Sequence, residues 1–93
     1  MPKAEISWRR VTEDGMRLQV YAHHVGRDWL FYARERRYEQ WQRIEEPPLA
    51  DWLELLDAAQ RLINRRRLRP EEEGRIKARI RESFPEVEFG PAG

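Results

Sequence analysis

The feature that most constrains this chain is a change of hydrophobic period at Pro47-Pro48. Before the two prolines, Val, Ile and aromatic residues roughly alternate with polar ones, which is typical of half-buried strands. After them, apolar residues recur every three to four positions, which is typical of amphipathic helices. Because neither proline can extend a central strand ladder, the sheet has to end there. The pattern predicts an α+β fold in which strands precede helices.

The first half is predicted to form an antiparallel meander of three to four strands over about residues 5–44. The expected strands cover residues 5–12, 16–25, 28–36 and 38–44. Gly15 suits the left-handed last position of a three-residue loop, and Gly26 suits the first position of a two-residue type II′ turn. The last turn has no Gly, Asn or Pro, so the register of the fourth strand is poorly determined.

The length of the first loop decides which side chains share a sheet face, because side chains alternate along a strand. A three-residue loop gathers the apolar side chains on one face, namely Ile6, Trp8, Leu18, Val20, Ala22, Trp29, Phe31 and Ala33. A two-residue Asp14-Gly15 turn would instead rotate Ile6 and Trp8 to the opposite face. We therefore prefer the three-residue loop.

Two helices are predicted after the prolines, over about residues 49–67 and 70–84. The first has the broader apolar stripe, made of Leu49, Trp52, Leu53, Leu56, Ala59, Gln60 and Ile63. We expect this helix to pack on one face of the sheet. The second begins at Pro70 and has a narrower stripe of Ile76, Ile80 and Phe84.

A length of 93 residues allows one modest core, so we expect a single domain over residues 1–93 with a frayed tail at 90–93. Residues 87–89 are predicted either as a short edge strand or as a docked tail. The absence of cysteine excludes a disulfide scaffold and a thiol nucleophile. No stretch is apolar enough to span a membrane and no secretory signal is recognisable, so we expect a cytoplasmic protein that binds no membrane.

The net charge of +1 conceals an uneven distribution of charge. Residues 1–43 sum to +3, residues 44–60 to −5, residues 61–81 to +6 and residues 82–93 to −3. In a homodimer, the acidic block of one copy could face the basic block of the other. The charge pattern therefore makes a second copy of the chain a candidate partner.

Catalytic and metal sites have little support in the sequence. His23 and His24 are neighbours in a strand and point to opposite faces, so they cannot share one ion. Ser7 and Tyr21 are expected to face each other with His23 on the same face, but an open sheet has no evident oxyanion hole. The five glycines form no phosphate-binding loop. We therefore expect no enzyme activity, no metal and no small-molecule cofactor.

The sheet face opposite the apolar one is the first candidate binding surface. It is predicted to present Arg17, Tyr21, His23, Tyr32, Arg34 and Trp41. Tyr21 and Tyr32 are directly opposed, and a third turn at residues 36–37 would place Tyr32 opposite Trp41 and Arg34 opposite Glu39. Rings flanked by arginines can stack on bases and meet phosphates of single-stranded nucleic acid. Cross-strand aromatic pairs also stabilise sheets, or can be covered by the second helix or a partner subunit, and we favour these explanations.

A run of arginines at the end of the first helix is the second candidate surface. It consists of Arg61, Arg65, Arg66, Arg67 and Arg69. Such a patch can bind phosphate. The same charges complement the helix dipole and can pair with nearby acidic residues, and we favour this interpretation.

Taken together, these features predict a small non-enzymatic module that acts through protein–protein contacts, with a homodimer as one form. The alternative is binding of single-stranded RNA or DNA through the Tyr/Arg face and the Arg-rich helix end. The observation that would best separate the two hypotheses is whether the Tyr21–Tyr32 face is bare, covered by the second helix or buried in a dimer.

Overall fold

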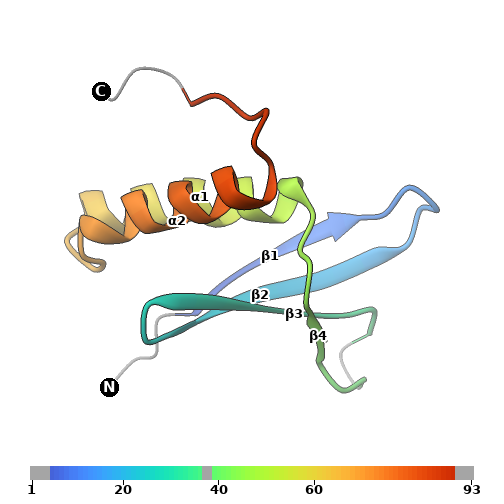
Figure 1. Ribbon diagram of the computed structural model, residues 1–93. Helices are drawn as coiled ribbons and strands as arrows, with labels where there is room; N and C mark the ends of the chain where they lie inside the picture. The colour runs from blue at the N-terminus through green and yellow to red at the C-terminus, as the bar shows by residue number, and fades with distance from the viewer. Residues whose placement is uncertain (1–4, 37–38, 90–93) are drawn as a thin grey trace. The chain divides into compact units, whose positions relative to one another are not determined.

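The computed structural model describes residues 5–36 and 39–89. Its elements are β1 (Glu5–Val11), β2 (Arg17–Val25), β3 (Asp28–Arg34), β4 (Gln42–Ile44), α1 (Leu49–Asn64) and α2 (Glu71–Ser83) (Figure 1). The strands form one antiparallel sheet in the order β1-β2-β3-β4. The predicted α+β class, with a meander followed by two helices, is confirmed. The chain divides into two compact units, residues 1–47 with the sheet and residues 48–93 with the helices.

Both predicted hairpin turns are present. Gly15 has a φ of 84°, and the Thr12 N–H donates to the Met16 carbonyl at 2.8 Å, which closes the three-residue loop. Gly26 has a φ of 60°, whereas the following Arg27 is not in the left-handed region, as a type II′ turn requires. These two turns set the β1–β2 and β2–β3 registers as predicted.

The last strand is shorter than predicted. β4 covers only Gln42–Ile44, whereas a strand over residues 38–44 was expected. Residues 37–38, which include the expected start of this strand and half of the expected turn, lie outside the described residues. β3 also ends at Arg34 instead of continuing to residue 36, so the connection between the two strands is longer than a tight turn.

The β4 register, which the sequence leaves open, differs by two residues from the one that a turn at residues 36–37 would give. Tyr32 pairs with Arg43, not with Trp41, and Glu39 lies in the connection and not opposite Arg34 in a strand. No Gly, Asn or Pro fixes a short turn here, so the longer connection is tolerated. A shift of two residues leaves every side chain on its predicted face. Trp41 therefore stays on the face that carries Tyr32.

One face of the sheet carries the buried side chains. They are Ile6, Val20, Ala22, Trp29 and Phe31, and all belong to the predicted apolar face. The ring of Trp8 meets that of Phe31 edge-on, with centroids 6.0 Å apart. The opposite face of the sheet is thereby left with the half-buried and exposed residues.

The helices α1 and α2 lie side by side (Figure 1). Their buried residues are Asp51, Trp52, Leu55, Leu56 and Ala59 of α1 and Glu72, Ile76 and Ile80 of α2. The predicted stripe of α1 is wrong at one edge, because Leu53 is 42% exposed whereas Leu55 is fully buried. Leucines flank the stripe on both sides, so periodicity alone did not decide which one faces inward. The bounds of α2 differ from the prediction by one residue at each end.

Helix α1 ends at Asn64, three residues earlier than predicted. Arg66 has a φ of 60°, the Arg66 N–H donates to the Ile63 carbonyl at 2.9 Å, and the Arg67 N–H donates to the Leu62 carbonyl at 2.9 Å. This is a Schellman motif, whose left-handed position is usually a glycine. Because an arginine occupies it here, no glycine marked the end of the helix.

The segment after α2 docks on that helix. The ring centroid of Phe89 lies 5.0 Å from Cζ of Arg81 and 5.6 Å from Nζ of Lys77. Residues 84–89 contain no strand, so the docked-tail prediction is confirmed over the edge strand. Residues 90–93, which were predicted to fray, lie outside the described residues. No helix in the described part of the chain has the length and apolar character needed to cross a membrane.

Candidate interaction surface

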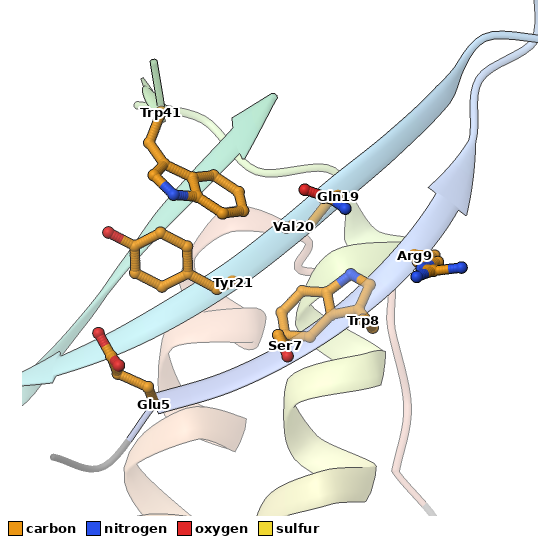
Figure 2. Close-up of a pocket in the computed structure, with 8 residues that line it drawn as sticks. All are labelled: Glu5, Ser7, Trp8, Arg9, Gln19, Val20, Tyr21 and Trp41. Carbon is orange, nitrogen blue, oxygen red and sulfur yellow. The ribbon is translucent and has the colours of Figure 1, made fainter. Parts of the chain in front are cut away.

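Three aromatic rings gather on the sheet face opposite the buried one. Tyr21 on β2 and Tyr32 on β3 are directly paired, with ring centroids 4.9 Å apart and planes 15° apart. Trp41, just before β4, meets Tyr21 edge-on, with centroids 4.7 Å apart and planes at 85° (Figure 2). The structure thus brings together the three aromatic residues of the predicted face. We call these three rings the aromatic cluster.

Arg34 extends the aromatic cluster through contacts that fix its guanidinium. Its Cζ lies 4.2 Å from the ring centroid of Trp41. Its Nε donates to Oε1 of Gln19 at 2.8 Å, and its Nη1 donates to the carbonyl of Glu39 at 3.4 Å. The guanidinium is therefore held against the sheet by three interactions, and binding a phosphate would compete with them.

The end of this face near the start of β1 carries a carboxylate. Glu5 pairs with His23 across β1 and β2, and Oε2 of Glu5 lies 3.6 Å from Nδ1 of His23. Burial, the neighbouring Tyr32 and the Glu5 carboxylate, in that order, raise the pKa of Tyr21 above its ordinary value of 10.0. The Glu5 carboxylate thus acts on the aromatic cluster, and it would repel a phosphate bound there.

A hollow of about 690 Å³ lies beside the aromatic cluster (Figure 2). Its lining consists of Glu5, Ser7, Trp8, Arg9, Gln19, Val20, Tyr21 and Trp41, half of which belong to β1. Ser7 lies opposite Tyr21, as predicted. His23 is not part of the lining, so this hollow does not place a histidine beside the Ser7 hydroxyl.

Of the other predicted residues of this face, Arg17 lies four residues before Tyr21 on β2, whereas His23 lies beside Glu5. Arg17 is exposed at the start of β2, opposite Val11. His24 points to the other face and stacks on Trp29, with ring centroids 4.6 Å apart. Over residues 5–36 and 39–89, no three His, Cys, Asp or Glu side chains are grouped so that they could hold a metal ion.

The arginines of the predicted basic patch surround the C-terminal end of α1. Arg61 forms an ion pair with Asp57 one turn earlier, whereas Arg65, Arg66 and Arg67 form the helix cap. Arg69 is exposed in the connection to α2. The patch therefore lies at one helix end, where its charges can complement the helix dipole.

The acidic start of α2 pairs mainly within its own helix. Glu72 is only 2% exposed and accepts a hydrogen bond from Arg75 at 2.7 Å. Oε2 of Glu73 lies 2.9 Å from Nε2 of Gln60 on α1 and 3.2 Å from Nζ of Lys77. Hydrogen bonds from Gln60 and then Lys77 hold the pKa of Glu73 below its ordinary value of 4.5.

The outer edge of β1 is a surface that the sequence had not singled out. The Thr12 N–H donates to the Met16 carbonyl, so the backbone groups of Thr12 point toward β2. Along an antiparallel strand, residues whose backbone groups point toward the paired strand alternate with residues whose groups point away from it. The residues whose backbone N–H and C=O groups point away from β2 are therefore Glu5, Ser7, Arg9 and Val11. No described strand pairs on that side of β1. Topology alone carried the signal, because the first strand of a meander lies at an edge unless the sheet closes.

Comparisons of this chain with protein families, curated proteins and solved structures found no match. No relative's function can therefore be carried over to it. The open edge of β1, the hollow beside it and the aromatic cluster are the features from which a function has to be inferred.

Proposed function

We propose that the chain is a non-enzymatic, cytoplasmic interaction module that binds another polypeptide by adding a strand to the outer edge of β1. One observation carries this proposal: β1 is a seven-residue strand whose outward backbone groups have no strand partner among the described residues. An added strand gains affinity from main-chain hydrogen bonds and specificity from pockets for alternate side chains. An edge of this length is normally blocked or covered unless it serves pairing.

The hollow beside β1 supports the same proposal. Ser7 and Arg9 contribute to its lining from the strand that would receive the peptide. Tyr21 and Trp41 add aromatic surface. Trp, Tyr and Arg are enriched at protein interfaces, where they supply much of the binding energy. We expect the hollow to take one side chain of the added strand.

Binding of single-stranded nucleic acid has less support from this geometry. The ring of Tyr21 is stacked on Tyr32 and has Trp41 at its side, so neither tyrosine offers both faces to a base. The guanidinium of Arg34 is already bonded, and the Glu5 carboxylate lies at the same face. Nucleic-acid platforms combine open rings with cations that meet phosphate.

A photo-crosslinking amino acid at position 9 tests the proposal. In a lysate of the source cells, we expect a discrete adduct that protease removes and nuclease leaves unchanged. The same probe at Arg27, in an exposed turn, should give none. Adding Ser7→Pro to the position-9 probe should abolish the adduct, because proline removes an outward N–H that an added strand needs. An adduct that nuclease removes, or no adduct, would contradict strand addition.

A further inference from the structure

We infer that the strand added to β1 is the β1 strand of a second copy of this chain. Two copies would pair antiparallel about a twofold axis at Ser7, so that their two sheets become continuous. This inference rests on the proposed function and names its partner. It is carried by the register that the outward backbone groups allow and by the charges along β1.

Backbone geometry restricts how two β1 strands can pair. Only the odd-numbered residues from Glu5 to Val11 direct their N–H and C=O groups outward. A residue whose backbone groups point outward must therefore face such a residue of the other copy. In a symmetric antiparallel pair this condition places the twofold axis at a residue and not between two residues. Among the central positions of the strand, the axis can pass through Ser7, Trp8 or Arg9.

Charge complementarity selects Ser7 from these three positions. With the axis at Ser7, Glu5 of each copy faces Arg9 of the other, so that two opposite-charge pairs form. The half-exposed Glu5 and the exposed Arg9 are both at the surface. With the axis at Arg9, two arginines face each other directly, which is unfavourable. With the axis at Trp8, Glu5 faces the apolar Val11 and has no cation opposite.

The Ser7-centred pairing also forms backbone hydrogen bonds between the strands and side-chain contacts on the other face of the sheet. Glu5, Ser7 and Arg9 each take part in a hydrogen-bonded pair, which gives about six hydrogen bonds between the copies. Ile6 of each copy faces Trp8 of the other, with Cβ atoms about 4.5–5.5 Å apart at non-hydrogen-bonded positions. One strand pair is a small interface, so we expect a concentration-dependent dimer with a Kd roughly in the micromolar range.

This dimer differs from one in which the acidic and basic blocks of the two copies meet. Arg61 already pairs with Asp57, and Lys77 already pairs with Glu73, within their own helices. Such local pairs reduce the charge that remains for a second copy. The Glu5 carboxylate, in contrast, is half-exposed and lies 3.6 Å from Nδ1 of His23, so it remains accessible to Arg9 of a second copy.

Sedimentation velocity of the full chain over a range of concentrations tests the inference. Glu5→Arg places arginine opposite Arg9, and Arg9→Glu places glutamate opposite Glu5, so each variant should weaken dimerisation about tenfold or more. An equimolar mixture of the two variants should dimerise again, because each strand then faces the opposite charge. Arg27→Glu serves as the matched control and should leave the dimer unchanged.

The mixture keeps the test valid even if one variant is less stable, since recovery requires both chains to be folded. Ser7→Pro should also abolish the dimer while far-UV circular dichroism stays the same, because edge strands tolerate proline where the N–H points outward. A monomer at all concentrations would overturn the inference, as would a dimer that the charge variants do not change. A crosslink from position 9 to a different protein would leave the proposed function standing in either case.

Discussion

Removing the indole of Trp41 should destabilise the sheet measurably, because its ring makes two specific contacts. It meets Tyr21 edge-on at 4.7 Å and carries the guanidinium of Arg34 at 4.2 Å. An aromatic pair contributes about 0.5–1.5 kcal/mol beyond buried area, and a partly exposed cation–π contact about 0.5–1 kcal/mol. We therefore expect Trp41→Ala to lower the free energy of unfolding by about 1–2.5 kcal/mol.

Thermal unfolding followed by near-UV circular dichroism measures this loss directly. In a domain of this size each kcal/mol corresponds to roughly 4–8 °C, so Tm should fall by roughly 4–20 °C. Arg43→Ala, at an exposed position two residues away, is the matched control and should change Tm little. In a double-mutant cycle with Arg34→Leu, the coupling energy to Trp41 should be about 0.5–1 kcal/mol.

The result also separates a stabilising role of the aromatic cluster from a base-stacking role. If Trp41→Ala left Tm unchanged while weakening binding to mixed single-stranded DNA at low salt, the rings would serve as a nucleic-acid platform. A coupling energy near zero between Arg34 and Trp41 would refute the reasoning by itself. Lower stability with no nucleic-acid binding in the parent chain is the outcome we expect.

Three further predictions concern single positions elsewhere in the chain. In urea unfolding, the Arg66→Gly variant should be about 1 kcal/mol more stable than the Arg66→Ala variant, because only glycine adopts a φ of 60° without strain. A glycine variant less stable than the alanine variant would contradict the assigned helix cap. Gly74→Ala should raise stability by about 0.5–1 kcal/mol, since a Cβ there meets nothing within 4 Å; no gain would show that the helix is restricted at this point. In absorbance titration at 295 nm, one tyrosine should ionise above pH 10, and Glu5→Gln should move that transition downward, because the carboxylate opposes the phenolate. The pKa of Tyr21 is higher in the folded than in the unfolded state, so the contribution of Tyr21 to stability is complete below about pH 10 and is lost as pH rises through the folded-state pKa. A tyrosine titration that Glu5→Gln leaves unchanged would contradict the interaction between Glu5 and Tyr21.

The parts of the sheet that could be predicted are those whose turns carry a glycine. Gly15 and Gly26 each supply a left-handed residue where a specific hairpin loop needs one, and both registers followed. The connection before β4 has no such residue, so the sequence leaves the register there open, and the observed register differs by two positions from the one that a turn at residues 36–37 would give. Similarly, the end of α1 was missed because Arg66 occupies a position that favours glycine.

The sequence predicted which residues make up the candidate surface, but not how their side chains pack. Alternation along the strands places Tyr21, Tyr32 and Trp41 on one face whatever the exact register of β4, since an even shift preserves the face. Side-chain rotamers decide whether the rings pack on each other and whether Arg34 bonds to Gln19. Periodicity does not determine these rotamers. These rotamers support our proposal of a protein partner over a nucleic acid.

Backbone amide hydrogen exchange in β1 tests the central claim most directly. The N–H groups of Ser7 and Arg9 point outward, whereas the N–H of Trp8 points toward β2. We predict that the Ser7 and Arg9 amides exchange rapidly in dilute solution and become at least about tenfold more protected as concentration passes the dimer Kd, while the Trp8 amide stays protected throughout. Rapid exchange of Ser7 and Arg9 at every concentration, in a chain that does self-associate, would contradict pairing through the β1 edge.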